Sequence, residues 1–198
     1  MIKNKMKKIM EIMMKTFLAT IMIGFLFLIG CSDENSLVAP ENNQASAPNW
    51  ITLPQRSGSS VETEFSVTKQ INGSLGGILE INQTYNSGPI VVKVKAKLQF
   101  PANCFPGTEN ITMLIDNVSG TVTYSPSMNF NIPAILDLEF MGLDLTGINP
   151  ADINFAYQDP DGTFDFVEYD KLKVQMNNGG LELKNAQIPH FSRYGYCR

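Results

Sequence analysis

The chain has 198 residues, with 15 basic and 19 acidic side chains and a formal net charge of −4 at pH 7. Residues 31–198 alone carry 10 basic and 18 acidic side chains, a net charge of −8. This balance argues against a nucleic-acid partner, which needs a clustered basic surface. About 170 residues, less a linker, suit one compact domain.

Residues 1–30 have the parts of a secretory signal peptide. A lysine-rich start precedes an apolar run from Thr16 to Gly30 (TFLATIMIGFLFLIG), and the run ends on a small residue. The run is shorter than the roughly 20 apolar residues that a membrane-spanning helix needs, and acidic residues follow it. We therefore predict a signal peptide that is removed, with an uncleaved membrane anchor as the alternative.

Cys31 follows Leu28, Ile29 and Gly30 directly. This Leu-Ile-Gly-Cys sequence resembles the lipobox of bacterial lipoproteins. The resemblance implies cleavage before Cys31, a diacylglycerol on its thiol and a fatty acyl chain such as palmitate on the new amino group. Two or three chains anchor a protein firmly, because each buried CH₂ contributes about 0.8 kcal/mol. Ser32 does not resemble an inner-membrane retention signal, so we expect lipid anchoring at the outer membrane of the cell envelope, on its periplasmic or cell-surface face.

Residues 31–60 are predicted to be the lipidated cysteine followed by a disordered linker. The stretch is polar, with three prolines and a Gly/Ser patch at its end. Such a composition cannot bury enough apolar surface to offset the entropy that is lost on ordering. Trp50, Ile51 and Leu53 are the exception, and they either dock on the edge of the domain or form a recognition patch.

From residue 61 onward the apolar pattern has a period of two, which is typical of β-strands. The run Ile90–Phe100 alternates throughout, and its three lysines share one face. We expect that face to be solvated and to discourage edge pairing. The other predicted strands, each closed by turn residues, are Glu64–Thr68, Gly77–Ile81, Asn110–Ile115, Gly120–Tyr124, Ala134–Phe140, Ile153–Tyr157, Phe164–Asp170, Lys171–Met176 and Leu181–Ile188.

The turns between these strands indicate the fold class. Asn178-Gly179-Gly180 predicts a hairpin between the last two strands. No segment has a sustained helical pattern, and we expect at most one helical turn within Leu143–Ala151. Many short strands at close spacing predict an all-β protein, with a single antiparallel β-sandwich over residues 61–198.

Asp159, Asp161 and Asp165 lie close together around a tight loop, which invites a calcium interpretation. A Ca²⁺ ion takes 6–8 oxygen ligands, and an EF-hand loop supplies a late glutamate that this stretch lacks. Asp161-Gly162 between two strands is primarily a hairpin turn. We therefore expect no metal and no cofactor here.

Two cysteines remain besides Cys31, namely Cys104 and Cys197. An exported protein with an even number of cysteines often pairs them, so one expectation is a disulfide between these two. It would close a loop of about 90 residues and contribute a few kcal/mol in the chain-entropy model. Two free thiols are the alternative.

Several short motifs resemble a known β-sandwich domain. They are Gly76–Leu79, Leu98–Pro106 (LQFPANCFP), Gly107-Thr108, Pro133–Leu136, Ile153–Tyr157 and Ile188–Tyr196. These motifs resemble the domain shared by zonula-occludens scaffold proteins, netrin receptors and ankyrins, over roughly Ser66 to Tyr196. Bacterial lipoproteins carry similar domains that end in His-Phe-Ser.

The resemblance gives a role to His190, Phe191 and Ser192. In some relatives, and in an unrelated nucleoporin domain, His-Phe-Ser is a self-cleavage site, where the serine hydroxyl attacks the preceding carbonyl and water resolves the ester. Here His190 would accept the Ser192 proton, and a strained Phe191–Ser192 peptide would favour the acyl shift. Cleavage would free only residues 192–198. Alternatively, His190 ends a strand with a hydrogen bond, Phe191 lies in the core and Ser192 caps a turn.

Two functions follow from these patterns. The first is a lipid-anchored cell-envelope protein that presents a non-enzymatic β-sandwich to a protein or glycan partner. It depends on the lipobox, the linker and the single histidine, since zinc sites and Ser-His-Asp triads need several convergent polar groups. The alternative is a self-processing domain whose enzymatic activity is to cleave its own Phe191–Ser192 bond. A glycan-active enzyme with paired carboxylates is a remote third option, because no carboxylate spacing supports it.

Overall fold

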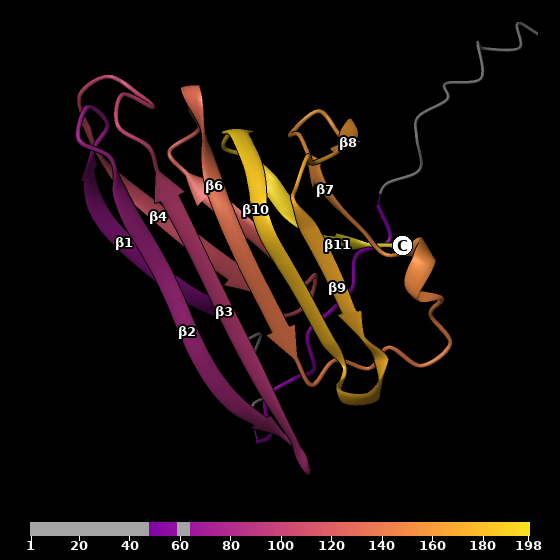
Figure 1. Ribbon diagram of the computed structural model, residues 1–198. Coiled ribbons are helices and arrows are strands. Elements are labelled where there is room, and N and C mark those ends of the chain that lie inside the picture. The colour runs from indigo at the N-terminus through magenta and orange to yellow at the C-terminus, as the bar shows by residue number, and fades with distance from the viewer. Residues whose placement is uncertain (1–47, 59–63) are drawn as a thin grey trace, which may run out of the picture. The chain divides into compact units, whose positions relative to one another are not determined.

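The computed structural model describes residues 48–58 and 64–198, and in these residues nearly all regular structure is β. Two antiparallel sheets pack against each other as the layers of a β-sandwich (Figure 1). The prediction of an all-β antiparallel sandwich is therefore confirmed.

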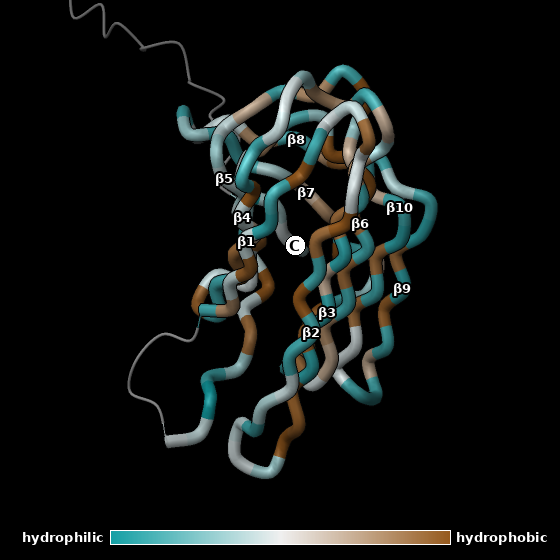
Figure 2. The backbone as a smooth tube through the Cα atoms, turned by 90° about the vertical axis from the view of Figure 1, so that its left-hand side faces the viewer, coloured by the Kyte–Doolittle hydropathy of each residue, from teal (hydrophilic) through white to brown (hydrophobic). Residues whose placement is uncertain are grey.

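We call the two layers sheet A and sheet B. Sheet A has six strands in the spatial order β1 (Glu64–Asn72), β4 (Thr108–Asp116), β5 (Thr121–Ser125), β11 (Arg193–Cys197), β7 (Asn154–Gln158) and β8 (Phe164–Phe166). Sheet B has five, in the order β2 (Gly77–Ser87), β3 (Ile90–Phe100), β6 (Asn129–Met141), β10 (Gly180–His190) and β9 (Lys171–Gln175). From the side, β1, β4 and β5 lie in one layer and β2, β3, β6 and β10 lie in the other (Figure 2).

Strand β3 shows how the sequence pattern builds the core. Every second residue from Val92 to Phe100 is buried, at most 2 % exposed. The lysines between them lie on the outer face of sheet B, where Lys95 is 3.5 Å from the carboxylate of Glu139 on β6. Exposed pairs of this kind add little to stability, so the lysine face is mainly a solvated, charge-paired surface.

The predicted strands all occur, and β3 matches its predicted bounds at both ends. The strand predicted over Phe164–Asp170 was too long, because β8 ends after three residues. Val167 then turns into the core, and the chain crosses to sheet B, where the main-chain N–H of Gln187 donates to the carbonyl oxygen of Glu168 at 2.8 Å. The crossing places this segment beside both sheets.

The C-terminal tail is a central strand, which the sequence analysis did not predict. Strand β11 lies between β5 and β7 in the middle of sheet A (Figure 1). Tyr194 and Tyr196 point into the core and are fully buried. Their alternation with Gly195 spans too few residues to indicate a strand by itself. Residues 192–198 are therefore held by two neighbouring strands, and breaking the Phe191–Ser192 bond would not release them from the folded domain.

Residues 48–58 dock on both sheets of the sandwich, so the linker predicted over residues 31–60 is wrong for this part: Ile51 bonds to β11 of sheet A, and Ser57 bonds to Asn86 on β2 of sheet B. The N–H of Ile51 donates to the carbonyl oxygen of Tyr196 at 2.8 Å, and Ile51 and Leu53 are 4 % and 3 % exposed. Trp50 covers Gly195 so closely that a Cβ atom there would lie 2.9 Å from the indole ring. Docking, one of the two expectations for this segment, is thus what the structure shows.

The predicted hairpin and helical turn are also present. Strands β9 and β10 are antiparallel neighbours joined by a 3₁₀ turn, Met176–Asn178, and by Gly179. Gly179 has φ +59°, and a Cβ atom there would lie 2.0 Å from the carbonyl oxygen of Leu143, so only glycine fits. A second 3₁₀ turn, Pro150–Asp152, falls at the end of the stretch where one turn was expected.

Candidate functional site

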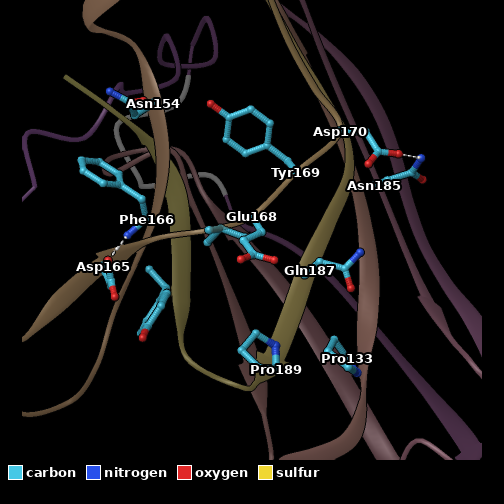
Figure 3. A pocket seen from close by; sticks show the side chains of 12 residues that line it. Pro133, Asn154, Asp165, Phe166, Glu168, Tyr169, Asp170, Asn185, Gln187 and Pro189 are labelled. Carbon is cyan, nitrogen blue, oxygen red and sulfur yellow. Dashed lines mark hydrogen bonds between the residues drawn. The ribbon is translucent and has the colours of Figure 1, made fainter.

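An open groove of about 940 Å³ lies where β7, β8 and the 167–170 crossing meet β10 and β6. Figure 3 shows Phe166 and Asp165 of β8 on one side, Gln187 and Pro189 of β10 on the other, and Glu168 between them. A concave surface of this volume falls within the range of ligand sites. The groove is therefore the main candidate for binding.

A β-bulge in β10 shapes one end of the groove. The pairing of β10 with β6 shifts register between Leu183 and Ala186, and Asn185 in the bulge has φ +54°. The carboxylate of Asp137 accepts a hydrogen bond of 3.0 Å from the Asn185 N–H, and the Asn185 amide donates one of 2.7 Å to Asp170. These two bonds fix the direction of the Asn185 side chain, which lines the groove.

Aromatic rings form much of the remaining lining. Phe166 is 57 % exposed on the edge strand β8, and the Phe164 ring meets it edge to face, with centroids 6.2 Å apart. Tyr157 and Tyr169 are half-buried and pack against the core. An aromatic side chain that stays this exposed beside a groove is available for contact with a ligand.

The groove is acidic. Among the described residues, its lining includes the carboxylates of Asp165, Glu168 and Asp170 and contains no Lys, Arg or His. The whole stretch 98–170 likewise contains none of these three residue types. Burial, with a further effect from the charges of Asp159 and Asp165, raises the pKa of Tyr157, so its hydroxyl stays a neutral hydrogen-bond donor.

His190 lies just outside this groove, at the end of β10. Its Nδ1 is 3.8 Å from a carboxylate oxygen of Asp159, and its ring meets Tyr157 edge to face at 4.9 Å between centroids. The carbonyl oxygen of His190 accepts a hydrogen bond of 2.5 Å from the Tyr194 hydroxyl. The histidine is thus held by its neighbours on sheet A.

The structure does not join His190 and Ser192 as base and nucleophile. The Ser192 hydroxyl donates a hydrogen bond of 2.5 Å to the main-chain carbonyl oxygen of Gln158, and a peptide carbonyl cannot take the proton as a general base would. Phe191 is buried and stacks on Tyr124 at 4.9 Å between ring centroids. This geometry matches the structural alternative, in which Phe191 belongs to the core at the corner between the sheets.

Cys104 and Cys197 are two separate buried thiols, so the expected disulfide is not formed. Phe105, next to Cys104, packs on Phe130, which in turn packs on Phe191. Cys197 lies six residues beyond Phe191 along β11, and six extended residues span about 20 Å. Cys104 therefore lies toward the Phe191 end of this stretch and Cys197 at its other end, whereas a disulfide needs Cα atoms roughly 5.5 Å apart.

The Asp159–Asp165 loop is a turn. The N–H of Gly162 donates to the carbonyl oxygen of Asp159 at 2.9 Å. The Asp161 carboxylate accepts hydrogen bonds from the N–H and the hydroxyl of Thr163, at 2.9 and 2.7 Å. Within residues 48–58 and 64–198, no group of three or more His, Cys, Asp or Glu residues is placed to hold a metal ion.

Half of the groove residues fall in one predicted strand, Phe164–Asp170, but the groove itself was not predicted. The signal was present in Phe164–Asp170 (FDFVEYD), where aromatic and acidic residues alternate and Val167 is the one aliphatic residue. The groove residues on β10 and β6 could not be assigned to the groove from the sequence. They reach Phe166 only because residues 167–170 cross from one sheet to the other.

Cys31 lies outside the described residues. In the described part of the chain, no helix is long and apolar enough to cross a membrane. Comparison with models of known protein families, with curated proteins and with solved structures gives no match to this chain. The two resemblances, to the lipobox and to the β-sandwich domain that ends in His-Phe-Ser, therefore stay predictions.

Proposed function

We propose that this chain is a lipid-anchored protein of the cell envelope that presents a non-enzymatic β-sandwich for binding, with the groove at β8 and β10 as its binding site. The observation that carries the binding function is the groove, with the half-exposed Phe166 ring beside it. The lipobox-like residues that end at Cys31 support the anchoring.

The chemistry of the groove supports binding more than catalysis. Among the residues that the structure describes, no Ser, Thr, Cys, Lys or His that would serve as a nucleophile lines the groove. Two of its three carboxylates already accept hydrogen bonds, Asp165 from the N–H of Phe166 and Asp170 from Asn185. These hydrogen bonds fix the positions of the two carboxylates. A binding surface whose groups are already in place loses less entropy when a ligand binds.

The chain length between anchor and domain supports display near a membrane. Sixteen residues separate Cys31 from Pro48, and a chain of that length reaches at most about 55 Å. A lipid on Cys31 would keep the sandwich within that distance of the bilayer.

Lipid attachment is tested by growing cells with an alkyne-tagged fatty acid and comparing the native chain with Cys31→Ser. We expect label and membrane association in the native chain and loss of both in Cys31→Ser. Cys104→Ser is the matched control, because it removes a thiol that the structure buries and should keep the label. Equal labelling of the native chain and Cys31→Ser would contradict the anchor.

Binding at the groove is tested by placing the photocrosslinker p-benzoylphenylalanine at position 166 and irradiating intact cells. We expect adducts from position 166 and none from the same residue at position 78, because Ile78 is also exposed but lies on β2. The absence of adducts from position 166 would contradict a binding role for the groove.

A further inference from the structure

We propose that the groove binds a neutral glycan chain. This inference rests on the proposed binding function and names the class of ligand. It is carried by an exposed aromatic ring, hydrogen-bonding groups held at fixed positions, and the charge of the lining.

The Phe166 ring is a platform for a sugar ring. It is 57 % exposed, yet Phe164 meets it nearly perpendicularly, at 82°. One face of a pyranose ring carries several C–H bonds, and the weak C–H contacts of such a face with an aromatic ring add to the burial of apolar surface. An aromatic ring left in solvent on an edge strand gains this burial only when a ligand covers it.

Planar polar side chains line the same groove as this platform. The main-chain N–H of Asn185 donates to Asp137 and the Asn185 amide donates to Asp170, and these bonds orient Asn185 and Asp170. Glu168 and Gln187, which lie opposite each other in Figure 3, form no side-chain hydrogen bond within the part of the chain that the structure describes. A carboxylate with two acceptor oxygens and an amide with both donor and acceptor suit the paired hydroxyls of a sugar.

The charge of the lining excludes acidic ligands. No Lys, Arg or His lines the groove to neutralise a phosphate, a sulfate or a uronic acid. A neutral sugar needs no such partner, because its hydroxyls donate hydrogen bonds to carboxylate and amide oxygens.

The details of β8 favour a glycan over a basic peptide. A peptide that adds a strand needs a free sheet edge, but β8 has only three residues and the Asp165 carboxylate caps the N–H of Phe166 at 2.8 Å. Asp165 and Asp170 both accept hydrogen bonds already, whereas the Glu168 carboxylate accepts none from any residue that the structure describes. The volume of about 940 Å³ is at the upper end for small-molecule sites and has room for several sugar units.

The test uses the purified full-length protein in detergent and calorimetric titration with neutral tetrasaccharides of glucose, mannose, galactose and N-acetylglucosamine. We expect at least one to bind. Phe166→Ala should then weaken binding about tenfold or more, since each 1.4 kcal/mol of lost contact is a factor of ten in Kd. Glu168→Ala should weaken it several-fold, while Ile78→Ala should bind as the native chain does. Unchanged thermal melting would show that each variant is folded.

The possible outcomes separate this inference from the proposed function. Failure of all four tetrasaccharides overturns the glycan inference, and adducts from position 166 in cells would still support the groove. Binding of an oligolysine peptide alone, weakened by salt, would overturn the neutral glycan in favour of a basic partner. Glycan binding that both groove variants leave unchanged would place the sugar elsewhere and also overturn the inference.

Discussion

The hydroxyl of Tyr196 donates a hydrogen bond of 2.6 Å to the main-chain carbonyl oxygen of Leu138, and this bond joins sheet A to sheet B across the core. Tyr196 is fully buried on β11, where its ring also packs against Phe140 and Phe155. Burial raises the pKa of Tyr196 well above its usual value, so the hydroxyl stays protonated as a donor.

Tyr196→Phe should lower the free energy of unfolding by about 1–2 kcal/mol, because it keeps the ring but removes a buried donor from the Leu138 carbonyl. Chemical denaturation would show this as a lower midpoint with an unchanged slope. An unchanged midpoint would mean that the bond between the sheets adds nothing to stability.

Tyr124→Phe should have no effect or a stabilising effect of up to about 1 kcal/mol. The hydroxyl of Tyr124 is buried and has no hydrogen-bond partner in the structure, so its removal relieves a desolvation cost. The same denaturation experiment compares a buried tyrosine whose hydroxyl has a hydrogen-bond partner with one whose hydroxyl has none among the described residues. A loss of stability equal to that of Tyr196→Phe would show that the Tyr124 hydroxyl has a partner after all.

The stability should fall in acid partly through Asp116. Burial alone would raise the pKa of Asp116, but hydrogen bonds from Ser119 and Val118 and the charge of Arg193 lower it below its usual value. Because the folded-state pKa lies below the unfolded value of about 3.9, the stabilisation is complete above that value and is lost as the pH falls through the folded-state pKa.

Asp116→Asn tests this pH dependence with little change of shape. The variant should be less stable than the native chain at pH 7, and the difference should shrink as the pH falls below about 4. Urea unfolding at pH 7, 4 and 3 measures both effects. A difference that stays constant over this range would rule out titration of Asp116 as the cause.

The two core cysteines should be free and shielded. Burial raises the pKa of Cys197 to about 11 and also raises the pKa of Cys104, so neither thiol is ionised at neutral pH. In a Cys31→Ser chain, Ellman's reagent should react slowly with the native protein. It should then release two equivalents per chain in denaturant without reductant, whereas a Cys104–Cys197 disulfide would give none.

The Phe191–Ser192 bond should stay intact, because the Ser192 hydroxyl is bonded to the Gln158 carbonyl and not to His190. Intact-mass measurement under denaturing and reducing conditions should show a chain that ends at Arg198. Denaturation is essential, since β11 would hold a cleaved segment in place. A species that lacks residues 192–198 would restore the self-processing function, and Ser192→Ala is the control that should abolish it.

The fold class and most strands were predictable from the pattern of residues along the chain. In β3 the alternation of apolar residues with lysines predicted both ends of the strand and its buried face, because period two reports directly which side of a strand meets the core. The hairpin at Gly179 was also predictable, since local turn chemistry requires glycine there.

Which elements meet depends on contacts between residues that are far apart in the sequence. Strand β11 is short, and its place between β5 and β7 depends on partners far away in the chain. The groove brings Pro133 of β6 and Pro189 of β10 to Phe166 of β8, and the two thiols lie apart for the same reason. Periodicity identifies the face of a strand but not its neighbour, so the binding site and the cysteine pairing followed only from the packing of the two sheets.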